Sequence, residues 1–396
     1  MAKSLSIYKN PSKKEYSLTD EQRDVYRQIS QNSREAKANA LLGLVPAIHK
    51  INFPRLDPCQ LMPQLEANSL RCISLFSGGG GLDLGFDRAG YSHVASYELI
   101  PVCKDTLLLN RPEWKVFGGP GEGDVTEVDW SCYEGGVEVV QGGPPCQPFS
   151  IAGEQKGLED ERNMWGEFIR AVNTIKPRAF VAENVLGLLN PKFKNFVKLH
   201  ILDELKDYKI FKFEMNSADF GVPQIRRRVF FVGFRSENAF KRFEIPRASH
   251  SWMHLTTKQN RLSSLFSDEL LKTSGVREAL GLDDIGYDGL APTIRSGFTG
   301  KRNTTSILNS SAGQKVWGDM GVWPNGVQAS REQASVFPAQ NQNFRLSVQD
   351  VAVLQGFPES WIFSGAVYQV LGQIGNSVSP PVAYHVARNV AKALNG

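Results

Sequence analysis

Short apolar segments alternate with amphipathic ones from residue 70 onward, and this alternation restricts the fold more than any other feature of the chain. The apolar segments are rich in Val, Ile and Phe, as β-strands are, while the stretches between them carry apolar residues at helical spacing. Strands that alternate with helices favour a doubly wound, mostly parallel α/β sheet. The expected strands are residues 71–76, 92–98, 136–143, 178–185, 209–216 and 228–234.

The alternation ends near residue 236, which indicates a change of domain. The residues that follow are irregular and rich in Gly, Ser, Asn and Thr, and regular patterning returns at 344–358. A helix-prone stretch near the N-terminus can be capped by Thr19 or Asp20. The predicted parts are a helical extension (1–66), the α/β domain (67–235), a smaller irregular domain (236–343) and a C-terminal segment that returns to the α/β domain (344–396).

Composition excludes several classes of protein. No run of about 18 apolar residues is present, so we expect no transmembrane helix, and the polar N-terminus does not resemble a secretory signal. The five cysteines are scattered without a CxxC pair, which favours a reducing cytoplasm over a disulfide framework or a zinc site, and we expect no metal. A net charge of +4 is compatible with a polyanionic partner.

Several unusual groups follow the expected strands, where ligands bind in open α/β sheets. Glycines 78–81 allow a tight turn and close approach of a ligand. Glu98 ends the next strand, where a carboxylate commonly binds ribose hydroxyls. Together they indicate a nucleoside-containing cofactor, with a plain structural turn as the alternative. Asp124 is either an acceptor for an adenine amino group or an ordinary turn residue.

A cysteine lies among prolines in GGPPCQPFS (142–150), which makes Cys146 a candidate nucleophile on a stiff loop. The alternative is an ordinary free cysteine. Glu183 is a carboxylate at the same rim, or an acid that satisfies a helix N-terminus. Arg226 and Arg228 are expected on one face of a strand and suit a base oxygen or phosphates, or form a solvated basic edge.

Four segments in this order and spacing resemble the motifs of the cytosine-5 DNA methyltransferases, in particular the bacterial restriction–modification enzymes. They are GGPPCQPFS (142–150), AENV (182–185), PQIRRR (223–228) and QIGNSV (373–378). The resemblance covers about residues 70–235 and 344–396. It implies a Rossmann-like enzyme that depends on S-adenosylmethionine and methylates C5 of a flipped-out cytosine.

The resemblance also assigns roles to residues. Cys146 would add to C6 of the cytosine, Glu183 would bind N3 and the exocyclic amine, and Arg228 would bind O2. Arg226 would support the active-site loop or bind phosphates. The residues implied for the cofactor pocket are Phe76 and Asp124 near the adenine, Glu98 at the ribose, Gly78 and Gly80 near the methionine part, with Ser77, Leu99, Asn376 and Ser377 around them.

Two positions depart from the family pattern. Ser74 stands where an Asp is usual, and Leu99 stands where an aromatic residue is common. Neither position takes part in the transfer chemistry, so the expected activity is unchanged.

The family places its target-recognition domain where residues 236–343 lie. The implied partner is double-stranded DNA carrying a short specific sequence, bound by a monomer in the cytoplasm at the nucleoid. A cognate restriction endonuclease would act on the same site. The candidate DNA-binding residues are Gln147, Ser150, Thr293, Arg295, Lys301 and Arg302.

Three other functions compete with this interpretation. A tRNA cytosine methyltransferase shares the motifs but has a smaller recognition region. A catalytically silent DNA-binding module would need neither Cys146 nor Glu183. A nicotinamide oxidoreductase fits the glycine run, but it gives Cys146 no reason to lie among prolines.

Overall fold

The computed structural model describes residues 19–44, 46–145, 164–255, 270–296, 304–336 and 342–396. The chain divides by contacts into two compact units. The first comprises residues 1–49 and 336–342, and the second comprises residues 50–335 and 343–396.

In the first unit, the described part of the N-terminal segment forms α1 (Asp20–Leu41). Thr19 caps it, because its hydroxyl accepts a hydrogen bond from the Gln22 backbone N–H while the Gln22 side chain accepts one from the Thr19 N–H. The helix and its Thr19 cap are therefore as the sequence predicts.

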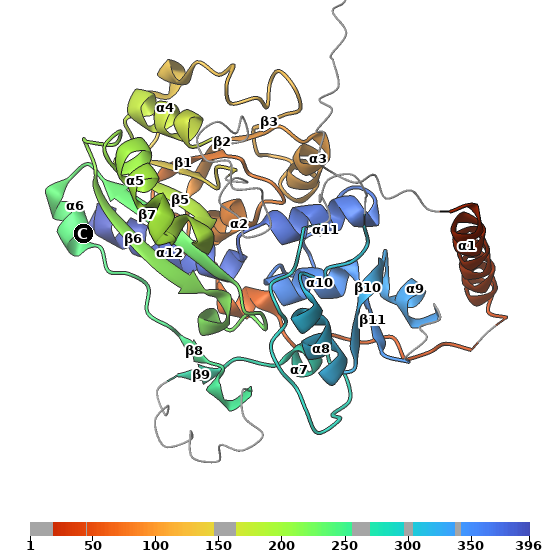
Figure 1. Cartoon of the computed structure of the whole chain (residues 1–396). Helices are drawn as coiled ribbons and strands as arrows, with labels where there is room; N and C mark the ends of the chain where they lie inside the picture. The colour runs from red at the N-terminus through yellow and green to blue at the C-terminus, as the bar shows by residue number, and fades with distance from the viewer. Residues whose placement is uncertain (1–18, 45, 146–163, 256–269, 297–303, 337–341) are drawn as a thin grey trace, which may run out of the picture. The chain divides into compact units, whose positions relative to one another are not determined.

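The second unit contains a mixed sheet, seven-stranded within the described residues, in the order β3-β2-β1-β4-β5-β7-β6 (Figure 1). All neighbouring pairs are parallel except those of β7 with β5 and with β6. The expected doubly wound, mostly parallel fold is confirmed. The strands are β1 (Arg71–Leu75), β2 (Ser92–Glu98), β3 (Val116–Gly118), β4 (Val139–Gly142), β5 (Ala179–Val185), β6 (Lys209–Asn216) and β7 (Arg227–Phe234).

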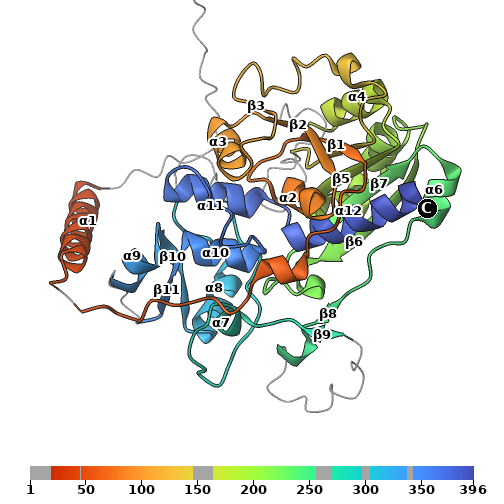
Figure 2. The same ribbon diagram turned by 180° about the vertical axis from the view of Figure 1, so that it is seen from behind.

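Helices cover both faces of this sheet, since the central strands are buried on both sides. On one face α2 (Gly81–Arg88) and α12 (Pro380–Asn395) lie side by side (Figures 1 and 2). On the other face α4 (Trp165–Ile175) packs six apolar side chains into the core on that side of the sheet. Lys176 caps the helix, before Pro177. The remaining helices near the sheet are α3 (Pro101–Asn110), α5 (Lys194–Val197) and α6 (Glu237–Arg242).

The described residues between 243 and 366 form short elements, and their apolar side chains share one core with the α2 face of the sheet. The region is less irregular than its composition suggests, because Val322 and Phe344 begin strands that pair in parallel. Its elements are β8 (His250–Ser251), β9 (Leu271–Lys272), α7 (Val276–Ala279), α8 (Ser311–Asp319), β10 (Val322–Gln328), α9 (Arg331–Val336), β11 (Phe344–Ser347) and α10 (Val348–Gln355), and α11 (Val367–Asn376) follows.

The second unit begins at Lys50 and not at the expected boundary after residue 66. The physical reason lies in the connector. The Asn52 amide donates to the Leu280 carbonyl and to the Asp350 carboxylate, at 3.0 and 2.9 Å. Met62 is fully buried in the core. Contacts therefore tie residues 50–66 to this unit although their sequence reads as a linker. No helix among the described residues is long and apolar enough to cross a membrane.

The contact between α2 and α12 leaves no room for a side chain at Gly85. A Cβ built there would lie 2.4 Å from the Ala383 Cβ and 2.6 Å from the Tyr384 backbone nitrogen. We expect Gly85→Ala to lower the free energy of unfolding by about 1–3 kcal/mol, because the two helices must separate. Urea denaturation of the full chain measures this change.

The matched control is Gly166→Ala in α4, where no neighbouring atom of the described residues lies within 4 Å of the added Cβ. There the same substitution should raise stability by a few tenths to about 1 kcal/mol, because alanine loses less conformational entropy in a helix. Equal effects at both positions would contradict the close-packing argument.

Candidate active site

A strained turn follows β1 and carries the glycine run. Phe76, Gly78 and Gly80 all have positive φ, at 59°, 56° and 82°. This conformation costs glycine little but is unfavourable for phenylalanine. The Gly78 N–H donates to the Glu98 carboxylate at 2.7 Å, so the end of β2 is tied directly to the turn.

Glu98 is buried and faces this turn with both carboxylate oxygens engaged. The second oxygen accepts a hydrogen bond from the Ile100 N–H at 2.9 Å. Burial raises the pKa of Glu98, while the hydrogen bonds from Ile100 and Gly78 act in the opposite direction. Leu99, the next residue, is exposed.

The loop of Asp124 lies against the end of β2. A Cβ on Gly123 would lie 2.2 Å from the Glu98 carbonyl oxygen, so the two loops are in direct backbone contact. The Asp124 carboxylate accepts from the Thr126 N–H and hydroxyl at 3.0 and 2.8 Å. Asp124 thus has the geometry of a turn residue and lies beside the predicted cofactor residue Glu98.

The C-terminal segment covers the glycine turn from the other side. A Cβ on Gly79 would lie 3.0 Å from the Ser377 hydroxyl oxygen. The Trp361 indole N–H donates to the Gly79 carbonyl at 3.1 Å. Ser377 is buried and Asn376, beside it, is exposed. The tertiary structure therefore brings the QIGNSV segment to the glycines that the sequence places at the first strand.

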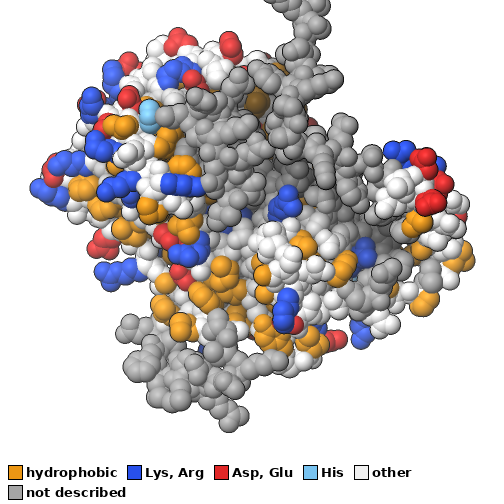
Figure 3. All heavy atoms as spheres, in the orientation of Figure 1, with side chains coloured by type: hydrophobic (Ala, Val, Ile, Leu, Met, Phe, Trp, Pro, Cys, Tyr) orange, Lys and Arg blue, Asp and Glu red, His pale blue; other side chains and the backbone are white. Residues whose placement is uncertain are grey.

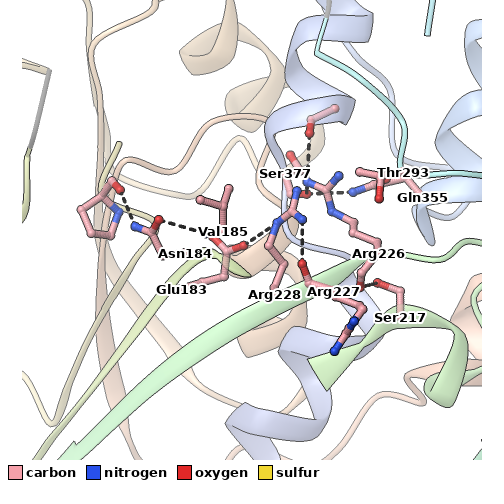
Figure 4. Close-up of polar contacts among 12 residues, drawn as sticks. Glu183, Asn184, Val185, Ser217, Arg226, Arg227, Arg228, Thr293, Gln355 and Ser377 are labelled. Carbon is pink, nitrogen blue, oxygen red and sulfur yellow. Dashed lines mark hydrogen bonds and ion pairs between the residues drawn. The ribbon is translucent and has the colours of Figure 1, made fainter. Parts of the chain in front are cut away.

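A buried ion pair lies at the ends of β5 and β7, with Glu183 and Arg228 3.0 Å apart (Figure 4). Their side chains are only 10% and 16% exposed. Burial raises the pKa of the Glu183 carboxyl, while the positive charges of Arg228 and Arg226 act against this shift. A carboxyl of this kind is suited to holding a proton for a ligand.

Arg226 is fully enclosed and binds backbone instead of solvent. Its guanidinium donates to the carbonyl oxygens of Gly375 and Ser377 at 2.9 and 2.7 Å (Figure 4). Arg226 therefore supports the QIGNSV segment, and its burial leaves it unable to reach the phosphates of a nucleic acid. Arg227 faces the other way and pairs with Glu214, as strand alternation predicts.

The start of the cysteine segment is anchored beside Glu183. The Asn184 side chain donates to the Pro144 carbonyl at 3.0 Å. A Cβ on Gly143 would lie 3.3 Å from the Glu183 carboxylate. The Met164 N–H donates to the Pro145 carbonyl, so the described residues on either side of segment 146–163 are in contact. Cys146, Gln147 and Ser150 lie outside the described residues.

Residues 291–296, from the region after the sheet, also reach this site. The Thr293 hydroxyl donates to the Ile225 carbonyl at 2.7 Å, so it binds the protein backbone. Arg295 is exposed next to it. A Cβ on Gly375 would lie 2.5 Å from the Ser296 nitrogen, so this segment touches the QIGNSV segment directly. Lys301 and Arg302 lie outside the described residues.

Two buried glutamines that join these segments were missed in the sequence. The Gln224 side chain donates to Gln355 Oε1 at 2.8 Å and accepts from the Ile294 N–H at 3.1 Å. The Gln355 amide donates to the Ser377 carbonyl at 2.7 Å. The available signal was a lone amide inside an apolar run such as VAVLQGF, because a buried amide must be hydrogen-bonded.

The turn has the features of a nucleoside site. Among the described residues, no neighbouring atom lies within 4 Å of a Cβ added at Gly78, and the Glu98 carboxylate accepts a hydrogen bond from the Gly78 N–H. These groups fit a ribose and its hydroxyls. Within the described ranges, no group of three or more His, Cys, Asp or Glu side chains is placed to hold a metal ion.

Comparison with known proteins gives a consistent result. Residues 70–392 match the model of the C-5 cytosine-specific DNA methylases. Type II methyltransferase M.NgoMIV of Neisseria gonorrhoeae is 34% identical over 330 residues, which cover 81% of this chain and 97% of that protein. Type II methyltransferase M.NaeI of Lentzea aerocolonigenes is 32% identical over 83% of this chain and 76% of that protein. The Dnmt2 methyltransferase of S. pombe shares the fold, with a TM-score of 0.53, 16% identity, and coverage of 83% of this chain and 100% of that chain.

The raised pKa of Glu183 predicts a pH dependence of stability. A carboxyl with a raised folded-state pKa favours folding below its unfolded pKa of about 4.3, and this contribution is lost as the pH rises through the folded value. Glu183→Gln removes the titration. We expect the free energy of unfolding of the variant, minus that of the wild type, to increase as the pH rises from 4 to 8 in urea titrations.

Glu138→Gln is the control of opposite sign. A hydrogen bond from Arg71 lowers the pKa of Glu138, so this carboxyl stabilises the fold above its unfolded pKa and loses that contribution as the pH falls through the folded value. The free energy of unfolding of Glu138→Gln, minus that of the wild type, should therefore decrease as the pH rises from 3 to 5. A flat difference for Glu183→Gln would contradict the burial argument.

Proposed function

The chain belongs to the C-5 cytosine-specific DNA methylases, which makes it a DNA cytosine-5-methyltransferase related to the type II restriction–modification enzymes. We propose that it transfers a methyl group from S-adenosylmethionine to C5 of a flipped-out cytosine in a short specific DNA sequence. In this proposal Cys146 forms a covalent bond to C6 of the base, and the enzyme modifies DNA for a restriction–modification system.

One observation carries the proposal, namely the buried Glu183–Arg228 pair with the first residues of the cysteine segment fixed beside it. A buried carboxyl whose pKa is raised and a guanidinium donor suit the N3 and O2 edge of a cytosine. The anchoring of Pro144 by Asn184 sets the starting point of the segment that carries Cys146. Because this edge lies inside a duplex, the base must leave the stack to reach these groups.

The residues of the turn would hold the cofactor. Glu98 would accept hydrogen bonds from ribose hydroxyls, Phe76 would pack near the adenine, and Gly78 and Gly80 would lie beside the methionine part. Asp124, Ser77, Leu99, Asn376 and Ser377 complete the pocket. When bound, S-adenosylmethionine supplies an electrophilic methyl group on a sulfonium centre.

Cys146 starts the reaction by addition. Its thiolate forms a bond to C6, and the C5–C6 π electrons move to C5. Glu183 donates a proton or hydrogen bond to N3, which neutralises the charge that develops on the ring, and Arg228 holds O2. Carbon C5 becomes nucleophilic and would form a bond to the methyl group, whose bond to the sulfonium sulfur would break with the electron pair left on that sulfur.

Elimination restores the aromatic ring. The C5 proton passes to a base, the C5–C6 double bond re-forms, and the Cys146–C6 bond breaks with the electron pair returning to sulfur. A thiol suits both steps, because sulfur is a strong nucleophile and a good leaving group. Arg226 acts indirectly in this scheme, by holding the segment that carries Asn376 and Ser377.

The proposed macromolecular partner is double-stranded DNA, contacted by residues of the 236–343 region. Thr293, Arg295, Lys301 and Arg302, with Gln147 and Ser150 of the cysteine segment, are the proposed contacts. Figure 3 shows Lys and Arg side chains over the described part of one face, with acidic side chains among them (Figure 3). We propose that the enzyme works as a monomer in the cytoplasm, and that a cognate endonuclease recognises the same sequence.

Removing the nucleophile should separate chemistry from binding. We expect Cys146→Ala to lower methyl transfer by roughly 10⁴-fold or more, the scale seen when a covalent nucleophile is lost. DNA affinity should be retained, because only the addition step needs sulfur. Tritium transfer and a gel-shift assay measure the two properties. Cys132→Ala, at an exposed free cysteine, is the matched control and should keep wild-type turnover.

A duplex with 5-fluorocytosine at the target provides a second readout for Cys146. Fluorine cannot leave as the C5 proton does, so the adduct should persist as a complex stable to denaturant. Its absence with active wild-type enzyme, or its presence with Cys146→Ala, would contradict the addition–elimination scheme.

Methylation mapping tests the substrate. Bisulfite sequencing of genomic DNA from a methylation-free bacterial host that expresses the chain should show protected cytosines within one short motif. Complete conversion, with soluble protein that binds S-adenosylmethionine, would contradict DNA as the substrate and direct the same assay to tRNA.

A further inference from the structure

A buried carboxyl lies beneath the glycine turn and takes no part in the mechanism above. Asp83, in the first turn of α2, is only 3% exposed. Its Oδ1 accepts a hydrogen bond from the Ser96 hydroxyl at 2.9 Å and one from the Ser77 hydroxyl at 3.3 Å. The Ser74 and Ser77 hydroxyl oxygens are 2.7 Å apart. The cluster thus joins β1, the glycine turn, α2 and β2.

Burying this carboxyl has a cost that the cluster only partly offsets. Asp83 Oδ2 has no hydrogen-bond partner among the described residues. Burial raises the pKa of Asp83, while nearby His93 and the serine hydroxyls act in the opposite direction. A hydrophobic residue would fill this position without the cost of removing a carboxyl from water. Packing alone therefore does not explain the carboxyl of Asp83.

The glycine turn explains it, because the backbone of Phe76, at the start of the turn, has an unfavourable conformation. Phe76 has a φ of 59°, and a non-glycine residue in this region costs on the order of 1–3 kcal/mol unless its surroundings fix it. Glu98 hydrogen-bonds the turn at Gly78 and Trp361 hydrogen-bonds it at Gly79, while the residue next to Phe76 donates its backbone N–H to the Tyr97 carbonyl at 3.3 Å. Ser77 is that residue, and its side chain is bound by Asp83 and Ser74.

The position of the carboxyl also bears on Ser74. The family pattern places an Asp at residue 74 on β1, and this chain has a serine there. Asp83 reaches the same cluster from α2 and binds the same hydroxyl that Ser74 contacts. A carboxyl beneath the turn is therefore present, supplied by α2 instead of β1.

We propose that Asp83 is a positioning residue for the cofactor, which holds Ser77 and thereby keeps the Phe76–Gly80 turn in the shape that receives S-adenosylmethionine. This inference rests on the proposed function, since it concerns the cofactor that the function requires. Asp83 touches neither the base nor the transferred methyl group in this scheme.

The test is equilibrium binding of S-adenosylmethionine to the full chain by calorimetry, together with KM and kcat. Asp83→Ala should weaken cofactor affinity about tenfold, which corresponds to about 1.4 kcal/mol. KM for the cofactor should rise in parallel, while kcat at saturating cofactor and KM for DNA stay within about twofold. Asp83→Asn keeps an accepting oxygen and should recover most of the lost affinity.

Ser77→Ala removes the same contact from the side of the turn and covers the case in which Asp83→Ala does not fold. It should weaken binding by a similar factor, and the double variant should be no weaker than either single one, because the two changes remove one interaction. Fully additive losses would overturn the proposed link between Asp83 and Ser77.

The matched control is Asp87→Asn, one turn further along α2, where the carboxylate pairs with Arg111 and does not contact the glycine turn. Its cofactor affinity should equal that of the wild type. Unchanged affinity in a folded Asp83→Ala variant would overturn the inference. A wild-type protein that binds no S-adenosylmethionine would instead overturn the proposed function, so the two failures are distinguishable.

Discussion

The seating of the C-terminal segment on the glycine turn is the contact on which the rest of the site depends. A Cβ on Gly81 would lie 2.1 Å from the Val378 carbonyl oxygen, so backbone meets backbone there without an intervening side chain. The same segment presents the carbonyl oxygens that bind Arg226. Close packing at the glycines therefore helps to place Arg226, which lies just before β7 and binds this segment.

Burying charged side chains at the ends of β5 and β7 is unfavourable unless they are paired. Two kinds of partner are present, namely a carboxylate for Arg228 and backbone carbonyl oxygens for Arg226. Arg226 donates from Nη2 to two backbone carbonyl oxygens, and among the described residues the Glu183 carboxylate forms its ion pair with Arg228. Two donors of Arg226, Nε and Nη1, have no partner among the described residues. Sites that bind charged or polar ligands commonly retain such unsatisfied groups, because a fully paired cluster would have nothing left to offer.

Two carboxyls shape the glycine turn by different means. Glu98 accepts the N–H groups of Gly78 and Ile100, while Asp83 accepts hydroxyl groups from below the turn, and both carboxyls are buried. In our proposals, Glu98 binds the ribose of the cofactor and Asp83 keeps the glycine turn in shape. When folding already fixes the turn in one conformation, less conformational entropy is lost as a ligand binds.

The sequence by itself determined the sheet, most of its strand positions and the order of the motifs, because strand and helix periodicities are local properties of the chain. It also indicated that Glu98, Asp124 and Glu183 follow strands and that Arg226 and Arg228 share a face. It did not reveal that residues 50–66 join the larger unit, since a connector's contacts depend on distant residues such as Asp350. The tertiary structure alone decided that QIGNSV meets the glycine turn, that Arg226 binds carbonyl oxygens, and that Gln224, Gln355 and Asp83 are buried and hydrogen-bonded. These outcomes rest on pairings between residues far apart in the chain, which no local pattern encodes.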